Sequence, residues 1–135
     1  MKDIRISYTD PWQKLHWRSL ESAYRRSAYF EFYEDELKPF YMEQKFTFLV
    51  DFNAALTDLL TTVLKLNKTL IPTSDYQKLL PECEDLRNAF SPRHSIPKQR
   101  SYPQVFENKF GFIPDLSIAD LLFSQGPEAT DFLSA

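Results

Sequence analysis

Apolar and polar residues alternate at the start of the chain. In DIRISYT, residues 3–9, the side chains of Ile4, Ile6 and Tyr8 fall on one side of an extended backbone. A strand needs a partner strand to be stable, and the pattern predicts no second strand in the rest of the chain. The segment therefore predicts either pairing with another molecule or a sheet that belongs to a longer protein.

A helical period follows at once. Asp10 is a typical N-cap residue and Pro11 a typical first helical residue. The apolar stripe of this helix comprises Trp12, Leu15, Leu20, Ala23 and Tyr24, and the opposite face carries Lys14, Arg18, Glu21 and Arg25. The pattern predicts an amphipathic helix whose aromatic side chains point inward and whose basic side chains meet solvent.

Two more helices are expected before residue 67. The longer covers residues 45–66 and is predicted to be the spine of the core, with an apolar stripe of Phe48, Leu49, Phe52, Leu56, Leu59, Leu60 and Val63. The shorter runs from about Tyr33 to Lys38, and Pro39 should end or kink it. Three acids, Glu34, Asp35 and Glu36, would then lie in its first turn, where the helix dipole favours negative charge.

The remaining pattern is weaker. A helical stretch is expected over residues 79–89 and a loop over residues 87–100. Ser117 and Asp120 resemble a capping box, and Gly126 and Pro127 suit the end of one helix and the start of a terminal one. The prediction is a mainly α fold: one compact helical domain, residues 1–135, of about five to six helices with a short N-terminal β-strand that belongs to a missing sheet.

Composition narrows the possible functions. The chain has 135 residues, of which 43% are hydrophobic, which is enough for a buried core. A net charge of −3 gives no reason to expect a nucleic-acid partner. With only two glycines, Gly111 and Gly126, a glycine-rich phosphate loop cannot be built.

Asp51 and Asp58 interrupt the longest apolar stretch, so membrane insertion is not expected. One cysteine and no visible signal peptide favour a cytoplasmic protein.

Histidine and cysteine are the first candidates for catalysis. His16 lies in the apolar stripe, and the spacing puts no orienting carboxylate on its face, so a buried structural histidine is the favoured interpretation. Cys83 with His94 as its base is weaker, because the acids in PECED disfavour a thiolate. These three residues also lack the close ligand pairs of a zinc site. We therefore expect no metal and no cofactor.

The loop over residues 87–100 offers a different chemistry. It carries Arg87, Arg93, Lys98 and Arg100 and no acid. Guanidinium groups bind phosphate and carboxylate through paired hydrogen bonds, so this loop could hold an anion. The alternative is a solvated loop without a ligand.

Three segments, taken in order, resemble the WbqC-like family of bacterial proteins. They are DPWQKLHWRSLESAYRRSAYFEFYEDEL, DLRNAFSP and YPQVFENKFGFIPDLSIADLLFSQGPEA, and together they extend over nearly the whole chain. The usual beginning of the family, an apolar and aromatic segment followed by strand-rich sequence, is absent. The resemblance thus agrees with the unpaired strand in predicting the C-terminal portion of a longer WbqC-like protein.

The resemblance also implies a biological setting. WbqC-like proteins occur in gene clusters for O-antigen and other surface polysaccharides, which implies a role in making those glycans. It further implies an anionic sugar or nucleotide sugar as ligand, and acyl or aminoacyl transfer to an activated sugar as the reaction class. The alternative, from a different class, is a non-catalytic helical module that scaffolds a biosynthetic complex.

The motif positions supply the residues to examine. The catalytic candidates are His16, Asp85 and Tyr102, and the ligand-binding candidates are Arg18, Tyr24, Arg87, Arg93 and Gln104. If the catalytic candidates and Arg87 converge in one open pocket, an enzyme is favoured. If they lie apart, the interaction module is favoured.

Overall fold

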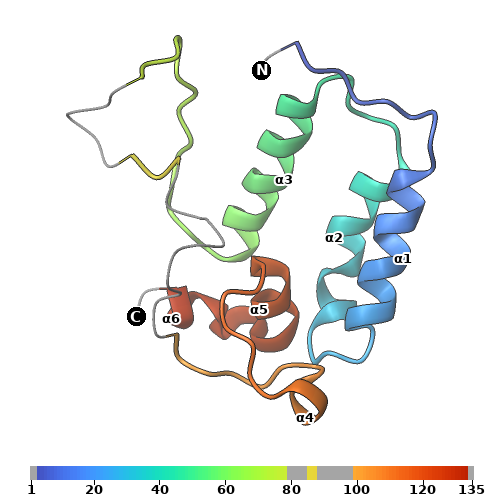
Figure 1. The fold of residues 1–135 in the computed structure, drawn as a ribbon, viewed down its shortest axis with the longest axis vertical. Coiled ribbons are helices and arrows are strands. Elements are labelled where there is room, and N and C mark those ends of the chain that lie inside the picture. Colours follow the sequence, from blue (N-terminus) through green and yellow to red (C-terminus); the bar gives the residue numbers. More distant parts are fainter. Residues whose placement is uncertain (1–2, 79–84, 88–98, 134–135) are drawn as a thin grey trace.

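Helices dominate the computed structural model, which describes residues 3–78, 85–87 and 99–133 (Figure 1). The helices in chain order are α1 (Trp12–Tyr24), α2 (Phe30–Met42), α3 (Leu49–Val63), α4 (Glu107–Phe110), α5 (Ile118–Gln125), the 3-10 helix η1 (Gly126–Glu128) and α6 (Ala129–Leu133). No named strand occurs in these described ranges. The prediction of a mainly α fold is confirmed.

Some predictions fall on other residues. Most of the helix expected over residues 79–89 and most of the basic loop lie outside the described residues. The same holds for Cys83, Arg93 and His94.

Helices α1 and α2 lie side by side and are joined by a short connection (Figure 1). Trp17, whose side chain is only 3% exposed, packs at ring-centroid distances of 5.9 Å from Phe30 and 5.8 Å from Tyr41. The predicted stripe was therefore partly wrong, since it omitted Trp17 and included Leu15, which is 57% exposed. Both choices fit a helical period, and the position of α2 decides which flank of α1 is buried.

Helix α2 begins earlier than the sequence predicted. It also ends later, because it continues through Pro39. A proline inside a helix removes a backbone donor and typically costs about 3 kcal/mol. Tertiary contacts oppose that cost: Leu37 is buried, and Gln13 Nε2 donates hydrogen bonds to the carbonyls of Phe40 (2.8 Å) and Glu43 (2.9 Å). The stabilisation from these contacts of the final turn therefore exceeds the cost of placing proline inside the helix.

The acid run has a different role from the predicted one. Glu31, and none of the three predicted acids, is the acidic residue in the first turn of α2. Glu34 instead pairs with Arg25 at 2.6 Å and with Lys38 at 3.4 Å. The earlier start of the helix moves the run into its middle, where Glu34 links the helix to the end of α1.

The N-terminal segment finds its partner inside the chain. Arg5 and Phe48 form an isolated antiparallel bridge. The amide of Ile6 donates to the Thr47 carbonyl at 2.9 Å, and the amide of Leu49 donates to the Ile4 carbonyl, also at 2.9 Å. The segment therefore pairs within the chain through one isolated bridge, and the predicted β-strand is not formed among the described residues. The sequence pattern could not show this partner, because residues 46–48 read as the start of a helix. Self-association through this segment stays a prediction.

The best-buried part of the core surrounds α5. The largest fully buried side chains are Phe30, Phe123 and Leu122. On α3, Leu56 is only partly buried and packs against this core from one side. Helix α3 is thus a flank of the core, and the prediction that it forms the spine is wrong. The apolar stripe of α3 indicates that one face of the helix is buried. It does not show that the helix lies at the centre of the core.

The end of α5 approaches the α1–α2 connection closely. Gly126 caps α5 with φ of 54°, and a β-carbon there would lie 2.5 Å from Tyr29 Cδ1, so a side chain is excluded. The amide of Tyr29 donates to the Phe123 carbonyl at 2.9 Å. Gly126 at the end of this helix, and Pro127 opening the next turn, confirm the predicted boundary.

The predicted capping box is absent. Ser117 has the extended backbone of an N-cap residue but forms no side-chain cap hydrogen bond. Asp120 is buried at 3% exposure and accepts a hydrogen bond from the Tyr102 hydroxyl. A partner from a distant segment has displaced the local capping interaction.

Truncation at the centre of the core should cost more than truncation on α3. Leu122→Ala should lower the free energy of unfolding by about 2–5 kcal/mol, because it leaves a cavity among fully buried neighbours. Leu56→Ala should cost less, because its side chain keeps solvent contact. Urea unfolding followed by circular dichroism measures both. An equal or larger loss for Leu56→Ala would contradict a core centred on α5.

Candidate functional site

A groove, here called the α1 groove, runs along one side of α1 and has a volume of about 620 Å³. Its lining residues come from the turn before α1, from α1 itself and from the end of α2: Tyr8, Thr9, Asp10, Pro11, Gln13, Lys14, Trp17, Arg18, Glu21, Tyr41, Met42 and Gln44. The volume falls within the range of small-molecule sites in proteins.

Hydrogen bonds fix the walls of the α1 groove. The Tyr8 hydroxyl donates to the Phe46 carbonyl at 2.7 Å, and the Trp12 indole N–H donates to the Ser7 carbonyl at 2.9 Å. Gln13 closes the far end through its two bonds to the end of α2. The turn before α1 is therefore held in place from both sides.

The α1 groove combines cations with aromatic rings. Lys14 and Arg18 are exposed and one helical turn apart, and neither forms an ion pair within the described part of the chain. Two acids also line the groove, but Glu21 is engaged with Arg25 at 2.7 Å. Burial raises the pKa of Tyr41, so its phenol stays protonated and can donate to a ligand. The groove therefore offers cationic and hydroxyl donors beside apolar ring surfaces.

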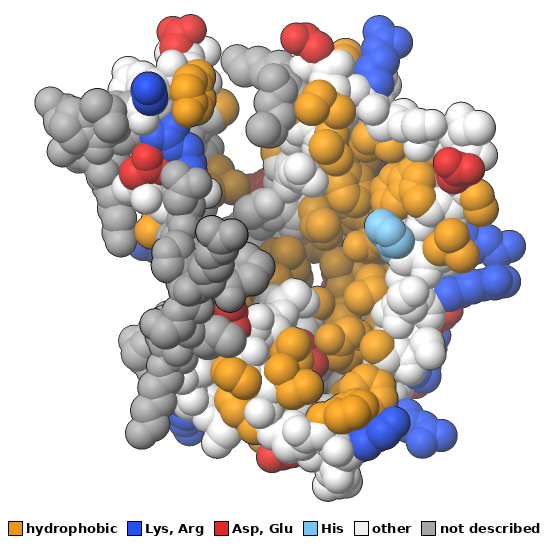
Figure 2. Space-filling model, in the orientation of Figure 1, with side chains coloured by type: hydrophobic (Ala, Val, Ile, Leu, Met, Phe, Trp, Pro, Cys, Tyr) orange, Lys and Arg blue, Asp and Glu red, His pale blue; other side chains and the backbone are white. Residues whose placement is uncertain are grey.

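An apolar hollow lies on the other side of α1, facing α3, with a volume of about 390 Å³. It is lined by Arg5, Ile6, Ser7, Trp12, His16, Tyr41, Leu49 and Phe52. Figure 2 shows hydrophobic side chains gathered around a depression in this face. Tyr41 lines both concavities, so the two lie back to back across the packed layer of α1 and α2.

His16 belongs to the apolar hollow and is exposed. Its ring meets the edge of Trp12 at a centroid distance of 5.3 Å. The expectation of a buried structural histidine is therefore wrong. The helical period correctly placed His16 beside Trp12. The side chain is nevertheless exposed, because the apolar hollow separates this part of α1 from α3.

Asp120 organises a buried polar cluster. Its Oδ2 atom accepts hydrogen bonds from the Tyr102 hydroxyl at 2.9 Å and from Gln104 Nε2 at 3.3 Å. Burial, with the nearby Asp120 carboxylate, raises the pKa of Tyr24 to about 12. Burial and a hydrogen bond to Asp120 likewise raise the pKa of Tyr102 to about 12. Three predicted ligand or catalytic residues thus converge on an aspartate that the sequence pattern assigned to a helix cap.

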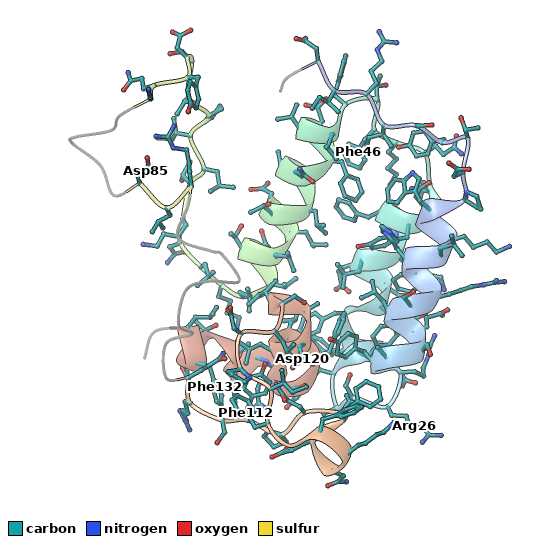
Figure 3. The ribbon with its side chains drawn as sticks, in the orientation of Figure 1. Arg26, Phe46, Asp85, Phe112, Asp120 and Phe132 are labelled. Atoms are coloured by element: carbon teal, nitrogen blue, oxygen red, sulfur yellow. The ribbon has the colours of Figure 1, made fainter. Side chains whose placement is uncertain are left out.

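The residues around this cluster hold it in place by ring packing and by backbone hydrogen bonds. The Tyr102 ring packs edge-on against Phe112 at 5.4 Å and Phe132 at 5.6 Å, and both lie near Asp120 in Figure 3. Gln104 also exchanges two hydrogen bonds with the backbone of Ile113, at 2.8 and 2.9 Å. Because the polar groups satisfy one another, the cluster joins α1, α5 and the segment after residue 100 into one unit.

Asp85 and Arg87 form a separate pair. Arg87 Nε donates to Asp85 Oδ1 at 2.7 Å, which holds the pKa of that carboxyl at about 2. The guanidinium also donates to the Gln77 carbonyl at 2.7 Å and lies 5.3 Å from the Tyr76 ring centroid. Figure 3 shows Asp85 well apart from Asp120.

The predicted residues therefore divide among separate places. His16 lines the apolar hollow, Arg18 the α1 groove, and Tyr24, Tyr102 and Gln104 the Asp120 cluster. The catalytic candidates do not share one pocket. Sequence reasoning missed Lys14, Trp17 and Tyr41 as groove residues, although the spacing of Lys14 and Arg18 was a usable signal for two cations on one helical face.

The described ranges are residues 3–78, 85–87 and 99–133. They contain no group of three or more His, Cys, Asp or Glu side chains that could hold a metal ion. In the same ranges, no helix is both long enough and apolar enough to cross a bilayer.

The fold defines a mainly α protein with two concavities flanking one amphipathic helix. A model of the WbqC-like protein family matches residues 1–91. The uncharacterized protein Rv1507c of Mycobacterium tuberculosis is 32% identical over 159 residues, which include 98% of this chain and 68% of that protein. The chain belongs to the WbqC-like protein family. No solved structure matches it significantly.

The position of the family match corrects one prediction. The matched residues start at the beginning of this chain, so the match does not support the description of the chain as a C-terminal portion. The internal partner of the N-terminal segment removes the physical argument for that description as well.

Tyr24, which is partly buried, and Tyr102, which is buried, predict a loss of stability in alkali. Each has a folded pKa of about 12, above the 10.0 of a free tyrosine. Only the unfolded state ionises between these values, so the stabilisation is fully present below about pH 10 and is lost as pH rises towards 12. Urea unfolding from pH 9 upward measures the loss.

The matched control is the double variant Tyr24→Phe with Tyr102→Phe. It should lose stability more gradually over the same pH range, although Tyr33 and Tyr41, whose pKa values burial also raises, keep some dependence. If both proteins lose stability equally steeply, the Asp120 cluster does not control the alkaline transition.

Proposed function

We propose that this protein binds an anionic sugar or nucleotide sugar in the α1 groove, as part of bacterial surface-polysaccharide biosynthesis of the O-antigen type. The observation that carries the proposal is the pairing of Lys14 and Arg18 with the aromatic side chains of one groove. Membership of the WbqC-like family supports the biological setting. A cytoplasmic location is part of the proposal.

The chemistry of the lining supports this ligand class. Arg18 can give a phosphate or carboxylate two parallel hydrogen bonds, and Lys14 adds a second positive charge one turn away. Sugar rings present apolar C–H faces and hydroxyl edges, which suit Tyr41, the amide of Gln44 and the carbonyl oxygen of Gln13, whose N–H groups bond the end of α2. A simple anion would use the cations alone, whereas a sugar-linked anion would use both parts of the groove.

The reaction class we propose is acyl or aminoacyl transfer to the bound sugar. In such a transfer, a sugar hydroxyl or amine attacks the carbonyl carbon of an activated donor. The new ester or amide bond forms as the leaving group departs with its bonding electrons, and the proton of the nucleophile passes to a base. His16 lines the apolar hollow and not the α1 groove, so it is not assigned as that base. We therefore propose the groove only as the binding site of the acceptor sugar.

One observation favours a second candidate function, a non-catalytic interaction module. The catalytic candidates lie in different places, and Asp85, Arg87 and Tyr102 are each engaged by groups within the fold. In that case the groove would recognise the glycan intermediate for partner enzymes without changing it. Incubation of the full protein with acyl donors and nucleotide sugars, followed by mass spectrometry of the sugar, separates the two. A modified sugar excludes the module as the whole function.

Removal of the groove cations should weaken binding of the anionic sugar. Lys14→Gln with Arg18→Gln should raise the dissociation constant of nucleotide diphosphate sugars at least tenfold, because one hydrogen bond to a charged group contributes about 1.5–3 kcal/mol and about 1.4 kcal/mol is a tenfold change in affinity. Isothermal titration calorimetry with uridine and guanosine diphosphate sugars measures the change.

The control variant has the same net charge. Arg26→Gln with Lys68→Gln removes two exposed cations that do not line the α1 groove. It should leave the affinity within about twofold, since screened charges outside the site contribute little. An equal loss in both variants would show that net charge, and not the groove, determines binding.

A further inference from the structure

The apolar hollow differs from the α1 groove in the kind of molecule it can hold. Trp12, Leu49 and Phe52 give it apolar walls, and Phe52 is itself 8% exposed and meets Trp12 edge-on at 5.8 Å. Leu49, at 38% exposure, leaves much of its surface towards the opening. Apolar walls form few favourable interactions with water, so binding of a ligand that covers them with apolar surface is favoured.

The charge at the opening has one sign. Arg5 is the charged lining residue, and no aspartate or glutamate is among the residues that line the hollow. The guanidinium lies 5.7 Å from the centroid of the Phe48 ring, and the bridge between Arg5 and Phe48 fixes the backbone beneath it. This cation is therefore held at the edge of an apolar space, where it attracts an anion and repels a cation.

Two polar side chains accompany Arg5. His16 is exposed at the hollow and can donate a hydrogen bond from its ring, and Ser7 lines the same region. The Ser7 hydroxyl donates to Thr9 Oγ1 at 3.2 Å and accepts from the Thr9 amide at 3.4 Å, so its role at the hollow is secondary. The donors gather beside Arg5, while the walls formed by Leu49 and Phe52 carry none.

We infer that the apolar hollow binds an amphiphile with a single apolar chain that ends in an anionic group. The chain lies against Trp12, Leu49 and Phe52, and the anionic group meets Arg5 and His16. A volume of about 390 Å³ accommodates one chain of medium length. The inference stands apart from the proposed function, because it uses the opposite side of α1.

Binding can be tested with three probes of equal chain length and different head groups: decanoate, decanol and decyltrimethylammonium. All are used at concentrations below micelle formation, and Trp12 fluorescence reports occupancy because its indole lines the hollow. Decanoate should bind at least tenfold more tightly than decyltrimethylammonium, and decanol should lie between them. Equal affinities for the three, or no saturable binding of decanoate, would overturn the inference.

Two neighbouring substitutions locate the site. Leu49→Asp puts a carboxylate into the hollow and should weaken decanoate binding at least tenfold. Val50→Asp is the matched control: Val50 is also in the first turn of α3, is 40% exposed and does not line the hollow. An acid in this turn suits the helix dipole in both variants, and circular dichroism checks that both remain folded. Equal weakening in the two variants would place the ligand elsewhere.

The head group is assigned by Arg5→Gln. This variant should reduce the preference for decanoate over decanol at least fivefold and leave decanol binding unchanged. A preference that is unaffected would show that Arg5 does not meet the anion. Vesicles of anionic phospholipid provide the last comparison, because a surface that binds membranes presents the same chemistry. Saturable binding of monomeric decanoate supports the inference, and binding to vesicles alone overturns it.

Discussion

Phe30 is the side chain on which the arrangement of the helices depends. It is fully buried, and its ring lies 5.9 Å from Trp17 of α1 and 5.0 Å from Phe123 of α5. One aromatic ring of α2 thus joins the neighbouring α1 to α5, which is distant in sequence. The close approach at Gly126 and the backbone hydrogen bond from Tyr29 to Phe123 hold α5 at the distance this ring requires. The hydrophobic effect supplies the energy here, and the glycine removes the steric obstacle.

This packing gives α1 three different environments around its axis. Trp17 and the residues near it face α2 and the core. Lys14 and Arg18 face the α1 groove, while Trp12 and His16 face the apolar hollow. A single amphipathic helix therefore contributes different side chains to a cationic site and to an apolar site, and Tyr41 of α2 lines both. Their separation follows from the α-helical period, which turns successive residues by about 100°.

The sequence pattern indicated several functional positions without indicating how they combine. Arg18 and His16 were correctly singled out, yet they serve concavities on opposite sides of α1. Tyr24, Tyr102 and Gln104 were grouped with them, whereas the fold gathers these three around Asp120. A capping motif is a local signal, and it could not report that a hydroxyl 18 positions earlier would take the Asp120 carboxylate. Convergence of distant residues depends on packing, which a local pattern does not contain.

The predicted start of α1 was one residue early, because Pro11 is the N-cap residue and the helix begins at Trp12. The sequence by itself determined the helical class, the end of α5 at Gly126 and the family. These features depend on short-range physics: the helical period, the fixed φ of proline and the freedom of glycine at positive φ. Only the tertiary structure decided which flank of α1 is buried, whether α2 crosses Pro39 and where the N-terminal segment pairs. In each of these cases contacts between segments far apart in the chain, and not the local preference, selected the outcome.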